Sequence, residues 1–141
     1  MISWLEKNNK LSWTITAIIA ITIFYLSSLN LGSGSTNTIS MLYHISAFFF
    51  LSLFLLISIV RKEKKNLILL AIMIAIFYGI SDEIHQFFVP GRNTSLLDVF
   101  LNSLGTLYAF MVYFISLEYR DKRSIPRKLN QNPTNNYRSN H

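Results

Sequence analysis

One stretch of the sequence, residues 81–105, collects most of the side chains that could do chemistry. It carries three of the seven acids of the chain, with an arginine, a histidine and several amides, between segments that are otherwise almost wholly apolar. An ionisable side chain inside a membrane span costs about 2.5 to 3.5 kcal/mol, so it persists there only when it is paired or used. We therefore predict a functional cluster here. Its residues are Asp82, Glu83, His85, Gln86, Arg92, Asp98 and Asn102, joined by His44 from an earlier segment.

The three acids of this stretch have a single cation nearby, Arg92. A guanidinium can bind one carboxylate through two parallel hydrogen bonds and touch a second, which leaves excess negative charge. We expect either that one acid is protonated or that a cation or a cationic ligand group completes the site. Glu83 is our preferred functional acid, whereas Asp82 could hold two helices together through Arg92 or Asn102.

Other polar residues have structural interpretations beside the functional one. Ser95 and Asp98 have the spacing of a capping box, so Asp98 could cap a helix as well as serve a site. Gln86 and Asn102 could make hydrogen bonds between helices.

Two histidines and the carboxylates could in principle ligate zinc. However, Glu83 and His85 are two residues apart on a helix and point to different sides. We therefore predict no metal site and no cofactor, and expect His44 and His85 to tie the second span to the residue 81–105 hairpin by hydrogen bonds.

The elements that position these residues are four apolar blocks of membrane-spanning length. The chain has 141 residues, is 51% hydrophobic and has a mean hydropathy of +0.35. About 20 apolar residues cross a hydrocarbon core of about 30 Å. We predict an all-α membrane protein with four transmembrane helices. Its domains are a leader (1–10), the spans (about 11–29, 41–60, 66–88 and 96–117) and a basic, disordered tail (118–141).

The positive charge lies mostly on one side of this arrangement. Twelve of the 13 lysines and arginines fall in the leader, the turn at residues 61–65 and the tail. The positive-inside rule then places both termini in the cytoplasm and the 81–105 stretch near the outer face of the cell membrane. This distribution argues against nucleic acid as a partner and favours membrane lipid. Cysteine is absent, which excludes disulfides.

Small residues recur every four positions on the third and fourth spans, where Gly79 and Gly105 belong to the two stripes. Such stripes let membrane helices approach closely. We expect these two antiparallel neighbours to stack stripe on stripe, with the polar cluster above.

The order Asp82-Glu83-Ile84-His85-Gln86, Pro90-Gly91-Arg92, then Asp98-Val99, Asn102 and Gly105 resembles the signature of the VanZ-like membrane protein family. His44 is similar to a histidine in the second span of that family. Where the family often has a lysine a few residues earlier, this chain has Ser40-Met41-Leu42-Tyr43 and no cation. The resemblance implies a multi-pass protein of the cell membrane that lowers susceptibility to teicoplanin-type glycopeptides.

Three functional interpretations follow. The first is a protein whose outward cluster binds an envelope lipid or a glycopeptide-type ligand, with antibiotic resistance as the phenotype. The second is a membrane enzyme acting on a lipid-linked substrate, with Glu83 or Asp82 as base, His85 or His44 as proton shuttle and Arg92 as anion clamp. The third is a cluster that only fixes helix packing, with function residing in a partner. We favour the first and lean against an enzyme.

Overall fold

The computed structural model describes residues 2–29, 38–60, 65–92 and 94–129, with side chains as far as Arg123. Their regular structure is entirely helical, which confirms the predicted fold class. The elements are α1 (Ile2–Lys7), α2 (Asn9–Ser27), α3 (Thr38–Ile59), the short 3-10 helix η1 (Lys65–Leu67), α4 (Ile68–Phe87) and α5 (Leu96–Leu129).

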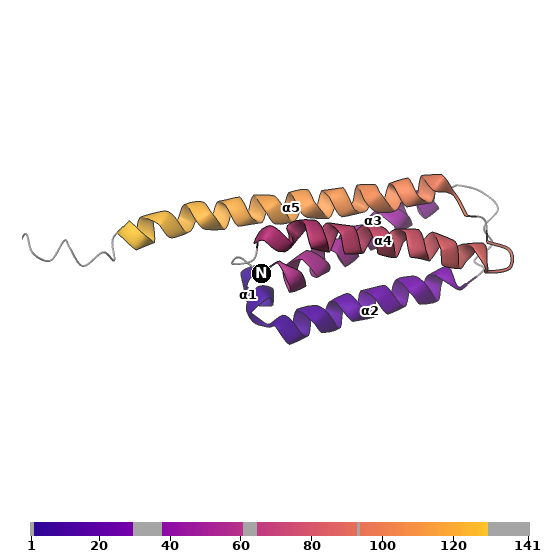
Figure 1. Cartoon of the computed structure of the whole chain (residues 1–141), viewed down its shortest axis with the longest axis horizontal. Coiled ribbons are helices and arrows are strands. Elements are labelled where there is room, and N and C mark those ends of the chain that lie inside the picture. The colour runs from indigo at the N-terminus through magenta and orange to yellow at the C-terminus, as the bar shows by residue number, and fades with distance from the viewer. Residues whose placement is uncertain (1, 30–37, 61–64, 93, 130–141) are drawn as a thin grey trace, which may run out of the picture.

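Four of the described helices are long and apolar enough to cross a membrane. They are α2, α3, α4 with η1, and α5 as far as Arg123. Neighbours in the chain run antiparallel (Figure 1), so the end of α2 lies at the same end of the bundle as the beginning of α5. The elements that carry the polar cluster are therefore gathered at this end.

Helix α3 is the centre of the bundle, because it packs on α2, α4 and most extensively on α5. Near the end where α3 finishes, Leu56, Val60, Tyr113 and Leu117 form a buried apolar core. The opposite half of α3 buries polar His44 instead. A buried histidine in the first half of a membrane span calls for a chemical explanation.

The predicted contact between the two small-residue stripes forms only in part, because Gly79 of α4 faces Asn102 of α5 whereas Gly105 of α5 faces α3. A Cβ at Gly105 would collide with the backbone carbonyl of Ile45 in α3 and come within 3.0 Å of the Phe49 nitrogen. A Cβ at Gly79 would lie 3.1 Å from the Phe48 ring in α3 and 3.3 Å from Asn102 Cβ. The stripe on α5 therefore serves the α3–α5 crossing, since α3 is the larger partner of α5.

The segment after residue 117 was predicted to be disordered, and this is wrong for its first part because α5 continues to Leu129. Arg120 pairs with Glu6 of α1 through two hydrogen bonds of 2.7 and 3.0 Å, and Tyr113 donates to the same carboxylate at 2.9 Å. Lys65 also pairs with Asp121. These contacts hold the extension of α5 against the rest of the chain. Residues 130–141 lie outside the described residues.

Candidate functional site

The polar cluster is built from four helices that meet at one end of the bundle. Helix α2 ends there, α3 begins there, α4 ends at Phe87 and α5 begins at Leu96. Between α4 and α5 the chain turns at Gly91, whose positive φ of 80° suits glycine, and the Arg92 N–H donates to the Val89 carbonyl at 3.1 Å. This turn returns α5 alongside α4 and sets Asp98 near Glu83.

Asp82 is a buried acid whose bonding capacity is well used. Its Oδ1 accepts a hydrogen bond of 2.6 Å from the Ser27 hydroxyl of α2, and its Oδ2 accepts one of 2.9 Å from the Gln86 amide. Gln86 also approaches Ser27 Oγ at 3.5 Å. Asp82 therefore ties α4 to α2, and not through Arg92 or Asn102 as the sequence suggested.

Arg92 makes no ion pair with Asp82, Glu83 or Asp98, all of which lie in the described part of the chain. Its side chain is half-buried, and its Nε atom has no hydrogen-bond partner there. The predicted two-pronged fork is therefore absent. The turn keeps Arg92 at a distance, from which its charge still acts on Glu83 and on Tyr43.

His85 turns towards α2 and away from the acids. Its ring stacks on Phe24 at a centroid distance of 4.3 Å, and its Nε2 lies 2.9 Å from Ser28 Oγ. Because Ser28 gives its proton to the Phe24 carbonyl, His85 is the donor to Ser28. The predicted tie from His85 to the second span is wrong: it joins α4 to α2.

His44 is buried between α3 and α5. Its Nδ1 lies 3.0 Å from Asn102 Oδ1, and its Nε2 lies 3.9 Å from Asp98 Oδ1. The expected bond between helices at Asn102 is thus made with α3. Since a carbonyl oxygen can only accept, Nδ1 carries the proton and Nε2 faces the acid.

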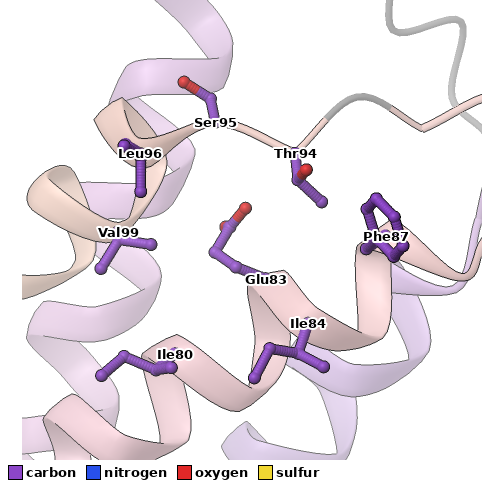
Figure 2. Close-up of a pocket in the computed structure, with 8 residues that line it drawn as sticks. All are labelled: Ile80, Glu83, Ile84, Phe87, Thr94, Ser95, Leu96 and Val99. Carbon is purple, nitrogen blue, oxygen red and sulfur yellow. The ribbon is translucent and has the colours of Figure 1, made fainter.

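Glu83 is the acid without a partner. Its residue is 6% exposed, and neither carboxylate oxygen completes a hydrogen bond of ordinary geometry with the described residues. The backbone N–H of Ser95 interacts with it only loosely. Figure 2 shows its carboxyl group extending from α4 towards the segment of Thr94 and Ser95. Buried unpaired carboxylates are costly, so this position calls for a ligand, a proton or an ion.

Glu83 also lies at the inner wall of a groove of about 350 Å³ between α4 and the start of α5. The other walls are mostly apolar, and Phe87 and Leu96 are 71% and 89% exposed. The groove is lined by Ile80, Glu83, Ile84, Phe87, Thr94, Ser95, Leu96 and Val99 (Figure 2).

Only part of the predicted capping box forms at the start of α5. The Ser95 hydroxyl accepts a hydrogen bond of 3.1 Å from the Leu97 N–H, which is the cap. The reciprocal bond from Asp98 is not made, and Asp98 Oδ1 is buried without a hydrogen-bond partner among the described residues. Asp98 therefore points into the cluster, towards His44.

Comparison with known families matches the VanZ/LLP1 family model over residues 5–117, which includes the first three spans and the fourth as far as Leu117. The chain belongs to the VanZ/LLP1 family. Comparison with curated proteins and with solved structures gave no match. Membership in VanZ/LLP1 agrees with the resemblance carried by residues 82–105.

In this VanZ/LLP1 protein, α2 contributes to the cluster in a way that was not predicted from the sequence. Ser27 and Ser28 hold Asp82 and His85. The sequence did hold a signal for this contact. Two adjacent serines end the first apolar span, and this end must lie at the same membrane depth as Asp82 and His85. The ion pair between Glu6 and Arg120 was also not predicted, because Glu6 lies in a leader for which no packing role was expected.

Proposed function

We propose that this VanZ/LLP1 protein binds an amphiphilic component of the cell envelope through its outward-facing polar cluster, and that this binding lowers susceptibility to teicoplanin-type glycopeptides. The observation that carries the proposal is Glu83. It is a buried carboxylate without a hydrogen-bond partner among the described residues, beside a groove whose remaining walls are mostly apolar.

The groove suits a molecule with an acyl or prenyl chain and a polar headgroup. Its exposed apolar walls, Ile84, Phe87 and Leu96, would face lipid, so a chain could enter from the bilayer without crossing water. Thr94, Ser95 and Glu83 supply hydrogen-bonding groups at the end nearer the turn. Envelope lipids, lipid-linked cell-wall intermediates and lipoglycopeptides all have this two-part chemistry.

The test is teicoplanin susceptibility of a Gram-positive host that expresses the protein, compared with Glu83→Gln. Glu118→Gln makes the same chemical change at an exposed position and is the matched control. We expect protection by the parent and by Glu118→Gln, and its loss in Glu83→Gln at equal membrane abundance. Equal protection by Glu83→Gln would contradict the proposal.

A second candidate function is an enzyme acting on a lipid-linked substrate, and one observation favours it. His44, Glu83 and Asp98 each offer a ligand atom within 4.8 Å of the others, so a histidine does converge on the acids. Asp82 already accepts hydrogen bonds at both oxygens, so Glu83 is the better base. His44 is the better proton shuttle, because His85 turns away from the acids. Arg92 would bind an anionic group of the substrate. Release of phosphate from a polyprenyl pyrophosphate in vesicles, absent with Glu83→Gln, would support this function over simple binding.

A further inference from the structure

We propose that His44, Glu83 and Asp98 form a binding site for one divalent transition-metal cation, with Asn102 orienting the histidine. The three ligands come from α3, α4 and α5, so the cation would join the three helices at the polar end of the bundle. This inference goes beyond the proposed function and does not depend on it, because it concerns what holds these three side chains together whatever occupies the groove.

The geometry is close to that of a metal site. One ligand atom from each residue lies within 4.8 Å of the other two, and His44 Nε2 is 3.9 Å from Asp98 Oδ1. Ligands bonded at about 2.1 Å to a tetrahedral cation lie about 3.4 Å apart. Closing the trio around an ion therefore needs movements of about 1 Å, which rotation of the two carboxylate side chains can supply.

Among the described residues, the carboxylate oxygens that would bind the ion accept no hydrogen bond of ordinary geometry. The Nδ1–H of His44 is given to Asn102, so in the neutral ring the lone pair of Nε2 faces Asp98. Asp98 Oδ1 and both oxygens of Glu83 lack hydrogen-bond partners among the described residues. Asn102 thus acts as the outer partner that fixes the tautomer of a ligating histidine.

Keeping the two buried carboxylates of this trio charged costs free energy unless a cation is bound nearby. The three residues are 3%, 6% and 7% exposed, and the described chain places no lysine or arginine in an ion pair with either acid. The remaining neighbouring acid, Asp82, is already held by Ser27 and Gln86, and Arg92 stands off. A divalent cation would neutralise the two carboxylates where lipid surrounds the helices, whereas alkali-metal ions would bind an imidazole only weakly.

Two carboxylates and one imidazole suit Zn²⁺ or Mn²⁺ and leave at least one coordination position open. Glu83 is the ligand that also lines the groove. An oxygen of a water or of a bound headgroup could therefore complete the coordination from the groove side.

The experiment measures metal on purified full-length protein in detergent, with any affinity tag removed. The protein is stripped with EDTA, equilibrated with Mn²⁺ or Zn²⁺ and gel-filtered, and bound metal is counted per chain. We expect about one ion per wild-type chain and per Glu118→Gln chain. Glu83→Gln and Asp98→Asn should lose most of it, and Asn102→Ala should bind about 10- to 100-fold more weakly, as outer partners of metal ligands typically do.

A second measurement uses only the wild-type protein, because a substituted chain could lose metal simply by misfolding. Electron spin-echo spectroscopy of Mn²⁺-loaded wild-type protein should show ¹⁴N coupling from an imidazole ligand. Retention of no Mn²⁺ or Zn²⁺ by the wild type, binding that is unchanged in the Glu83→Gln/Asp98→Asn double variant, or bound Mn²⁺ without ¹⁴N coupling would each overturn the proposal.

Discussion

At the scale of single residues, the cluster divides into bonded and unbonded acids. Asp82 accepts hydrogen bonds from a neighbouring helix and from its own helix, whereas its sequence neighbour Glu83 has none of ordinary geometry. Adjacent positions on a helix are 100° apart, so one acid turns to α2 and the other to the gap between α4 and α5. One acid therefore stabilises the packing of α4 on α2, and the adjacent acid remains available for a ligand.

The bond between Ser27 and Asp82 gives a direct test of this division. Ser27→Ala removes the closest donor to a buried carboxylate, which should destabilise the protein by about 1.5 to 3 kcal/mol, as for hydrogen bonds to charged groups. Ser46→Ala is the control, because Ser46 is exposed and bonds only to its own helix backbone. Thermal unfolding in detergent measures both; equal stability of the two variants would contradict the assignment.

At the scale of elements, the fold depends on the close crossing of α3 and α5. Gly105 meets the backbone of α3 at Ile45 and Phe49, which cannot move without separating the helices. Gly79 meets the edge of the Phe48 ring, which can rotate. Similar small residues thus carry different constraints, because one faces backbone and the other faces a side chain.

Alanine substitutions should separate these two glycines. We expect Gly105→Ala to destabilise the bundle by about 1 to 3 kcal/mol, the usual cost of overpacking. Gly79→Ala should cost less, since both substitutions gain about 1 kcal/mol of helix propensity but the one at Gly79 requires a smaller displacement. Unfolding in detergent measures the difference. A Gly105→Ala variant as stable as Gly79→Ala would show that α3 and α5 do not cross at this point.

At the scale of the whole molecule, one end of the bundle is polar and the other is closed by apolar packing and an ion pair. The polar end gathers parts of α2, α3, α4 and α5. At the opposite end, Glu6 and Arg120 clamp α1 onto α5 through a bidentate pair. This end also carries described basic residues such as Lys7, Lys65 and Lys122, and it is the one predicted to face the cytoplasm.

The predicted orientation can be measured directly, because the chain has no cysteine. Thr94→Cys at the polar end should react with a membrane-impermeant maleimide in intact cells. Lys122→Cys, near the other end, should react only after the membrane is opened. The reverse pattern would invert the topology and would place the groove at the cytoplasmic face, against the proposed function.

Most of the architecture could be predicted from the sequence. Span-length apolar blocks, short polar breaks and the Pro90-Gly91 turn define helices within a few residues, because a lipid environment leaves the backbone few alternatives to a helix. The observed starts of α2 and α3 are only two and three residues earlier than predicted. The main error, disorder at residues 118–129, arose because an ion pair between residues 6 and 120 leaves no local signal.

By itself, the sequence determined the all-helical fold, the concentration of polar residues in one stretch and the signature that marks the family. Those properties depend on composition and spacing, which are local. Only the tertiary structure decided the partners: Asp82 with Ser27, His85 with Ser28, and His44 with Asn102 beside Asp98 and Glu83. These pairings depend on how four helices rotate about their axes, and that rotation is set by packing on α3 and by close contacts such as the one at Gly105.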